Sequence, residues 1–218
     1  MTPEMSESNF GTKAIIADWN YDGYNDILKL TTTVNPEVGG RPEAIRLLIN
    51  DPKSKGNFAS FQDLPFHETY TVEAADFNND GRLDLYAVSE NVDYIIWNNS
   101  SNTDGTINVT MKNVFSGRTE DWGGNTHAWD IDGDGLRDVG VSGSRIAFLK
   151  NKSGERLFDP NSEITREWNL LRAHDFCWID INNDGMIDVF VGTQRGYRMF
   201  VQDPTELGNK PADDKSKK

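Results

Sequence analysis

The stretch "DIDGDGLRD", residues 130–138, places four aspartates around two glycines within nine residues. The aspartates occupy the first, third, fifth and ninth positions of the stretch. Carboxylates this close together repel one another unless a positive charge lies between them. The stretch therefore indicates a site for a cation.

The same pattern is repeated along the chain. "DWNYDGYND" begins at Asp18, "DFNNDGRLD" at Asp76 and "DINNDGMID" at Asp180, so all four segments read D-x-[DN]-x-D-G-x-x-D. Their starts are separated by 58, 54 and 50 residues. A repeat of about this length is typical of stacked or radial repeat proteins. We therefore predict four equivalent loops, at residues 18–26, 76–84, 130–138 and 180–188.

The chemistry of the four loops favours calcium. Ca²⁺ takes about six to eight oxygen ligands, and a glycine at the sixth position allows the turn that directs these oxygens inward. Zn²⁺ is a poor fit because no His or Cys lies at a ligand position, and Mg²⁺ prefers a smaller octahedral shell with retained waters. A merely polar turn needs no carboxylate at the ninth position. We predict about four structural Ca²⁺ ions, held by side chains at positions 1, 3, 5 and 9 and by the backbone carbonyl at position 7: Asp18, Asn20, Asp22, Tyr24, Asp26; Asp76, Asn78, Asp80, Arg82, Asp84; Asp130, Asp132, Asp134, Leu136, Asp138; and Asp180, Asn182, Asp184, Met186, Asp188.

The segments that flank the loops exclude an EF-hand. That helix–loop–helix motif requires a bidentate Glu at position 12, where this chain has Lys29, Ala87, Val141 and Val191. Short apolar runs bounded by turn residues lie before and after each loop, which is typical of β-strands. These runs are 14–17 and 27–31, 71–75 and 85–89, 127–129 and 139–143, and 176–179 and 189–193.

Two further runs complete each repeat. A third apolar run ends at an amide residue, namely Asn50, Asn98, Asn151 or Gln202, and the first unit reaches it after an insertion at 34–43. In three units a fourth run follows a glycine, at 56–61, 105–111 and 154–158. Four short antiparallel strands in a unit of about 50 residues form a propeller blade. The sequence therefore predicts an all-β fold, a β-propeller of about four four-stranded blades.

From Ala14 to Gln202 the chain resembles the FG-GAP/VCBS repeat family, in which a D-x-D-x-D-G-x-x-D calcium loop joins the first two strands of each blade. The resemblance implies a calcium-stabilised propeller like the α-subunit head of integrins. Members of the family adhere to proteins, bind sugars or accompany polysaccharide-degrading enzymes. Because one fold serves all these functions, the resemblance does not choose among them.

The fourth unit departs from the pattern. Residues 203–218 lack apolar alternation and are expected to form a disordered polar tail, so the outer strand of this unit is missing and the propeller domain spans 1–202. Residues 1–12, or pairing with another molecule, are expected to cover the open edge. Three arrangements remain: a small closed ring, a segment of a larger propeller, or a partial ring completed by another copy.

Composition and charge limit the classes of partner and the cellular compartments that we expect for this protein. The net charge of −13 argues against nucleic acid and anionic membranes. No run has transmembrane length, so we expect no membrane insertion. Millimolar calcium sites favour an extracellular or periplasmic protein, although the first ten residues lack the apolar core of a signal peptide. The lone Cys177, between two aromatic residues, is expected to be a buried, inert thiol.

The sequence contains no recognisable catalytic motif. Its three histidines lie at different offsets from the loops, and neither a nucleophile elbow, a phosphate loop nor a zinc motif is present. We therefore predict a protein without enzymatic activity. The first hypothesis is an adhesion or carbohydrate-binding module, and the alternative is an accessory domain of a polysaccharide-degrading enzyme or of a larger surface complex.

Trp122, near the third loop, is the first residue to consider for ligand binding. Trp122 lies in the segment "DWGGNTHAWD", where an exposed ring can stack on a sugar, although packing between blades is an alternative. Trp129 directly precedes the third loop, and we expect it to pack between blades. The insertion at 34–43 offers a second candidate surface for a carbohydrate or protein ligand.

Overall fold

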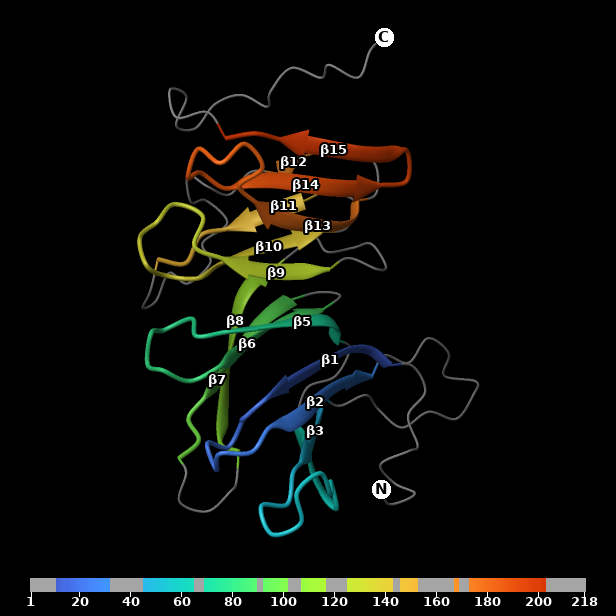
Figure 1. Cartoon of the computed structure of the whole chain (residues 1–218), viewed down its shortest axis with the longest axis vertical. Coiled ribbons are helices and arrows are strands. Elements are labelled where there is room, and N and C mark those ends of the chain that lie inside the picture. The colour runs from blue at the N-terminus through green and yellow to red at the C-terminus, as the bar shows by residue number, and fades with distance from the viewer. Residues whose placement is uncertain are drawn as a thin grey trace. The chain divides into compact units, whose positions relative to one another are not determined.

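The computed structural model describes residues 11–31, 45–64, 69–89, 92–101, 107–116, 125–142, 146–152, 167–168 and 173–202. Every regular element in these ranges is a β-strand, and the strands form four antiparallel sheets (Figure 1). The predicted all-β, blade-like architecture is therefore confirmed. No described segment forms a helix with the length and apolar character needed to cross a membrane.

The chain divides into two compact units, residues 1–118 and 119–218. The first unit contains two four-stranded sheets in which the strands pair in chain order. The first sheet consists of β1 (Gly11–Ala17), β2 (Asp26–Thr31), β3 (Ile45–Ile49) and β4 (Ser60–Leu64). The second sheet consists of β5 (Thr69–Ala75), β6 (Asp84–Ser89), β7 (Val92–Asn98) and β8 (Val109–Ser116).

The second unit repeats this plan with one sheet shortened. The third sheet has the order β12-β11-β10-β9, formed by β9 (Thr126–Trp129), β10 (Asp138–Ser142), β11 (Ile146–Leu149) and β12 (Glu167–Trp168). The fourth sheet has three strands among the residues that are described: β13 (Ala173–Ile179), β14 (Asp188–Thr193) and β15 (Gly196–Phe200). The sequence predicts that the fourth repeat lacks its outer strand, and residues 203–218, which would carry it, lie outside the described ranges.

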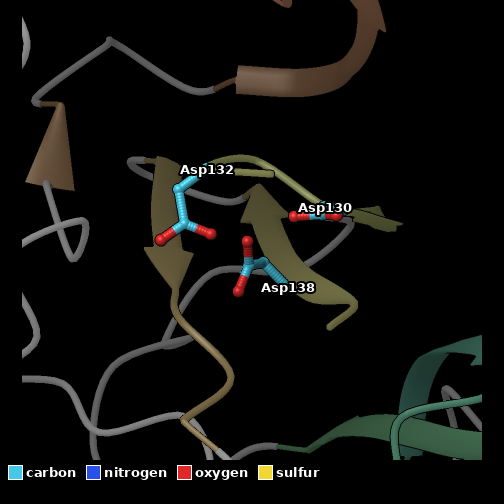
Figure 2. Close-up of side chains that lie close together, drawn as sticks. All are labelled: Asp130, Asp132 and Asp138. Carbon is cyan, nitrogen blue, oxygen red and sulfur yellow. The ribbon is translucent and has the colours of Figure 1, made fainter. Parts of the chain in front are cut away.

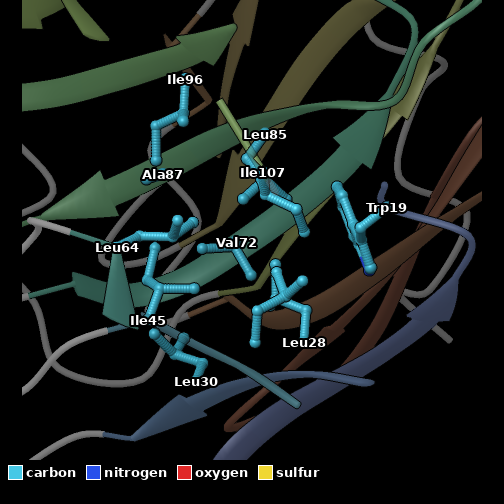
Figure 3. Packing of buried hydrophobic residues seen from close by; sticks show 11 residues of the cluster. Trp19, Leu28, Leu30, Ile45, Leu64, Val72, Leu85, Ala87, Ile96 and Ile107 are labelled. Carbon is cyan, nitrogen blue, oxygen red and sulfur yellow. The ribbon is translucent and has the colours of Figure 1, made fainter. Parts of the chain in front are cut away.

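The core of the first unit lies between its two sheets. Leu28 and Leu30 of β2 and Ile45 of β3 pack with Val72 of β5 and Leu85 of β6 (Figure 3). These side chains alternate along their strands, so that one face of each sheet is buried. Trp19, the second residue of the first loop, closes one end of the cluster and is only 2% exposed.

The core of the second unit is smaller and more aromatic. Phe176 and Trp178 of β13 form edge-to-face contacts with each other, and both rings contact Phe148 of β11. A Cβ on Gly140 of β10 would lie only 2.6 Å from the ring of Phe176, so the glycine allows the ring to approach the strand closely. The Nε2 atom of His127 lies 3.0 Å from a carboxylate oxygen of Asp175, which links β9 to β13.

The prediction for Cys177 was wrong. Cys177 is exposed rather than buried, because its neighbours Phe176 and Trp178 turn toward the core and alternation directs the thiol to the opposite face of β13. The outer strand that the structure describes in the third sheet is Glu167–Trp168, which the sequence did not predict.

Several predictions fall wholly or partly outside the described residues. Trp122, the insertion at 34–43, the run at 154–158 and the tail at 203–218 all lie outside them. Of the twelve N-terminal residues expected to cover the open edge, Gly11 and Thr12 belong to β1 and the other ten lie outside.

Candidate metal centres

Each of the four loops joins the first two strands of its sheet, as the repeat predicts. The sixth-position glycines have φ angles of 84° to 92°, in the left-handed region that favours glycine. The fourth position also has a positive φ, at Tyr21, Asn79, Gly133 and Asn183. Two left-handed residues within three positions curl each loop, and the frequency of Asn and Gly at position 4 is the signal that sequence reasoning missed.

The ninth-position aspartate of every loop is buried and fastens the loop to its own sheet. One carboxylate oxygen accepts the backbone N–H of the second loop position, at 2.8–3.2 Å. The other oxygen accepts the backbone N–H of the amide residue after the third strand, at 2.8–2.9 Å. We call this pair of hydrogen bonds the scaffold of the loop. It stabilises the loop because buried N–H groups are costly to leave without an acceptor. The carboxylates that form the scaffold in the four loops are those of Asp26, Asp84, Asp138 and Asp188, all 0% exposed.

The amide residue that ends the third run has a structural role. The side chains of Asn50 and Asn151 donate to the carbonyl oxygen of the eighth residue of their own loops, at 3.0 and 3.1 Å. Asn98 instead donates to the carbonyl oxygen of Trp19 in the first blade, at 3.0 Å. In these three blades the side-chain amide therefore ties the end of the third strand to a loop, which accounts for the asparagine at this position.

The first, second and fourth loops share one further network. Their first-position carboxylates accept the backbone N–H groups of positions 5 and 6, at 2.8–3.1 Å. The third-position asparagine donates its amide to the fifth-position carboxylate, at 2.8–3.1 Å. The members of this network are Asp18, Asn20 and Asp22; Asp76, Asn78 and Asp80; and Asp180, Asn182 and Asp184.

The third loop differs because its third position is Asp132. Carboxylate oxygens of Asp130, Asp132 and Asp138 lie within 4.8 Å of one another, and Figure 2 shows Asp132 and Asp138 pointing toward each other. The Oδ1 atom of Asp130 is buried and has no hydrogen-bond partner. The ammonium group of Lys150 forms ion pairs with Asp132 and with Asp134.

Burial makes the ninth-position carboxylates costly to ionise. The pKa of Asp84 and of Asp138 is raised to about 6, chiefly by burial and also by the nearby first- and fifth-position carboxylates, whereas the backbone hydrogen bonds act in the opposite direction. Burial also raises the pKa of Asp26. A cation inside the loop would favour the charged form of each of these groups.

The donor set fits a hard cation. An ionised carboxylate has about four lone-pair sites, and the scaffold occupies two of those on each ninth-position aspartate. Oxygens of positions 1, 3 and 5 surround the same turn, and in the third loop one of them is buried without a partner. All-oxygen ligation of this kind suits Ca²⁺ better than softer metals.

Sequence reasoning missed the ion pairs that two basic side chains form with the loops, and it misjudged the exposure of one tryptophan. Arg82 pairs with Asp80 at 2.6 Å in the second loop, and Lys150 pairs with the third loop. Trp129 is 37% exposed, with the Arg137 guanidinium 5.9 Å from its ring centroid, so the prediction that it packs between blades was wrong. β9 ends at Trp129, where the chain leaves the sheet.

The comparisons with known proteins agree with this geometry. A model of the FG-GAP-like repeat matches residues 18–87 and again residues 76–141. Each match starts at the first aspartate of a loop, and together they cover more than half of the chain. A comparison with curated proteins found no match. FG-GAP repeats are typical of extracellular proteins, often bind calcium and are generally non-enzymatic. The chain therefore belongs to the FG-GAP-like repeat family.

Proposed function

We propose that this protein is a calcium-stabilised, non-enzymatic binding module with one structural Ca²⁺ in each of its four loops. The observation that carries the proposal is the convergence of Asp130, Asp132 and Asp138, whose oxygens lie within 4.8 Å of one another. The Oδ1 atom of Asp130 is also buried without a hydrogen-bond partner. The same ninth-position scaffold recurs in the other three loops, which supports extending the role to them.

In each loop the ligands would be the side chains at positions 1, 3, 5 and 9 and the backbone carbonyl at position 7. When bound, calcium would supply positive charge that cancels the repulsion among the carboxylates. The scaffold fixes the loop to two strands of its sheet, so an ion held by the same carboxylates stabilises the junction of those strands. A ligand that binds only the folded state raises the free energy of unfolding by mass action.

A structural rather than a catalytic role for the metal follows from the crowded shell. Five protein oxygens fill most of the shell of Ca²⁺ and leave about one to three positions for water, whereas a catalytic metal needs an open position beside an acid or base. The second-position side chains, such as Phe77 and Ile131, are apolar, and Phe77 is completely buried. These residues are unsuited to proton transfer, which supports the absence of catalysis at the loops.

We further propose an extracellular or periplasmic setting and a carbohydrate or protein ligand bound outside the metal shell. The exposed ring of Trp129, beside the first ligand of the third loop, supports carbohydrate binding because an aromatic face with an adjacent guanidinium can stack on a sugar and donate hydrogen bonds to it. Trp122, seven residues earlier in the chain, is a second candidate on the basis of the sequence alone.

Glycan-array binding in calcium tests this ligand proposal. We expect Trp129→Ala or Trp122→Ala to abolish binding while the melting temperature stays unchanged. Binding lost only in a folded Asp134→Ala variant would instead favour a sugar bridged directly by calcium. Absence of a glycan signal in every condition would contradict carbohydrate binding and favour a protein ligand.

The calcium proposal is tested separately by melting the protein with and without EDTA. We expect chelation to lower the melting temperature by many degrees, and Asp22→Ala to reproduce part of that loss in calcium. An unchanged melting curve in EDTA would contradict a structural role for the ion.

A further inference from the structure

Lys150 lies against the carboxylates of the third loop. Its ammonium group pairs with Asp132 and also lies 3.2 Å from an oxygen of Asp134. The three side chains are only 19% to 35% exposed, so solvent screens these ion pairs less than pairs on the open surface. One cation therefore bridges the third and fifth positions of the loop.

This bridge replaces a contact that the other loops make with an amide. In the first, second and fourth loops, the third-position asparagine donates its Nδ2 hydrogen to the fifth-position carboxylate. Asp132 has no such donor, and its own charge would repel Asp134. Lys150 supplies the missing donor together with a compensating positive charge.

The position of Lys150 is fixed by the scaffold of the same loop. The next residue, Asn151, donates its backbone N–H to Asp138 at 2.8 Å and its side-chain amide to the carbonyl of Arg137 at 3.1 Å. In the other repeats the residue before the amide is Ile49, Trp97 or Val201. An added acid at position 3 and an added lysine before the amide therefore occur together in one blade.

Arg82 provides an instructive contrast in the second loop. It pairs with the single carboxylate of Asp80 and also donates to the carbonyl of Asn98, while the amide contact from Asn78 to Asp80 is retained. The first and fourth loops retain the same amide contact. Among the described loops, only the third has a cation in place of the amide contact.

We propose that Lys150 is a built-in counter-ion that holds the third loop together without metal and that calcium must displace from Asp132 and Asp134. This inference rests on the proposed calcium sites. It follows that the third loop binds calcium less tightly than its four carboxylates alone would allow, and that its shape depends less on the metal.

The expected size of the effect follows from competition for the same oxygens. Calcium binding must break both ion pairs, and the affinity falls by the factor that those pairs contribute to the metal-free state. For partly screened pairs this factor is about fivefold. Removing the ammonium group should therefore increase the calcium affinity of the third loop by about fivefold and destabilise the loop when calcium is absent.

The test is a calcium titration of the full chain, followed by ¹H–¹⁵N NMR at the four sixth-position glycine amides. Gly135 reports the third loop, because its N–H donates to Asp130 at 2.9 Å. Gly23, Gly81 and Gly185 make the equivalent bond in the other loops and serve as internal controls. Lys150→Met keeps most of the side-chain stem, and Lys152→Met, at an exposed lysine two residues further, is the matched control.

In Lys150→Met we expect the midpoint of the Gly135 titration to move to about fivefold lower calcium, with the other three midpoints unchanged. Lys152→Met should leave all four midpoints at their wild-type values. A Gly135 midpoint that does not move, or that moves to higher calcium, would overturn the role of Lys150 while leaving the calcium sites intact. If none of the four glycines responds in the wild-type protein, the proposed calcium sites fail, and this inference fails with them.

A double variant keeps the proposal testable if Lys150→Met alone does not fold. Asp132→Asn combined with Lys150→Met gives the third loop the residue pattern of the other three, so it should fold. With Asp132→Asn alone it completes a double-mutant cycle. If Lys150 acts through Asp132, Lys150→Met should raise the affinity at Gly135 less when Asp132→Asn is already present than in wild type. An equal effect in both backgrounds would overturn the proposed competition.

Discussion

The first and third loops share their scaffold and differ in the group that donates to the fifth-position carboxylate. Asp26 and Asp138 each accept two backbone N–H groups and are fully buried. Around Asp22 the first loop uses an asparagine amide, whereas around Asp134 the third loop uses Lys150. The repeat therefore keeps the hydrogen bonds that fasten the loop to the sheet and varies the charges around the third and fifth positions, which we call the rim of the loop.

The largest effect should come from breaking the scaffold. Asp138→Ala leaves two backbone N–H groups without their carboxylate acceptor, and each hydrogen bond to a charged group contributes about 1.5 to 3 kcal/mol. We expect the free energy of unfolding to fall by about 3 to 6 kcal/mol, in EDTA as well as in calcium. Urea unfolding under both conditions measures it, and Asp26→Ala should cost a similar amount in the first loop.

Asp134→Ala is the matched change at the rim. Asp134 is partly exposed, accepts one backbone N–H, from Leu136, and pairs with Lys150, so its removal should cost less than that of Asp138 in EDTA and more in calcium than in EDTA. Equal losses for Asp138→Ala and Asp134→Ala in EDTA would contradict the division between scaffold and rim.

A buried carboxylate outside the loops should behave differently with pH. Burial outweighs the opposing hydrogen bonds from Tyr86 and from the backbone of Ser89, so that the pKa of Asp93 is raised to about 7. Because the folded-state pKa lies above the ordinary value of 3.8, the stability that Asp93 contributes is present below about pH 4 and is lost as pH rises to about 7. The total loss is roughly 4 kcal/mol at most, since one pKa unit corresponds to about 1.4 kcal/mol.

Asp93→Asn removes this titration while retaining an oxygen acceptor. We expect the stability of the variant relative to wild type to be greater at pH 8 than at pH 5, as measured by urea unfolding in EDTA. The loops titrate alike in both proteins, so the difference isolates Asp93. A difference that is the same at both pH values would show that Asp93 is not the group that titrates.

The smallest effect concerns the aromatic core of the second unit. In Gly140→Ala the new Cβ would lie 2.6 Å from Phe176 and 3.0 Å from Trp178, and overpacking of this kind costs about 1 to 3 kcal/mol. Gly192→Ala is the control, because its Cβ would lie 3.7 Å from the nearest atom, an ordinary contact. Thermal melting compares the two variants, and a destabilisation of equal size in both would argue against close packing at Gly140.

The strands and loops were predictable because each carries a local signal. Apolar runs with turn residues at their ends located the inner three strands of every blade, and the spacing of Asp and Gly located the loops. The outer strand of the third sheet was not predictable in this way, because Glu167–Trp168 is short and carries no apolar alternation.

Features that depend on contacts between distant residues were missed. The amide at Asn151 was visible in sequence, but its bond to Asp138 becomes apparent only when the third strand is placed beside the loop. The pairing of Lys150 with the third loop was missed for the same reason. The exposure of Cys177 depends on which face of β13 is covered, and its aromatic neighbours suggested the wrong face.

The number of calcium ions bound by the folded protein tests the central claim most directly. Isothermal titration calorimetry of the metal-free full chain gives this number without reference to any ligand of the module. We predict about four ions per chain, in agreement with the four repeated loops, and saturation with calcium should restore the melting temperature that is lost in EDTA. Absence of any binding heat, together with a melting curve that calcium does not change, would contradict the account.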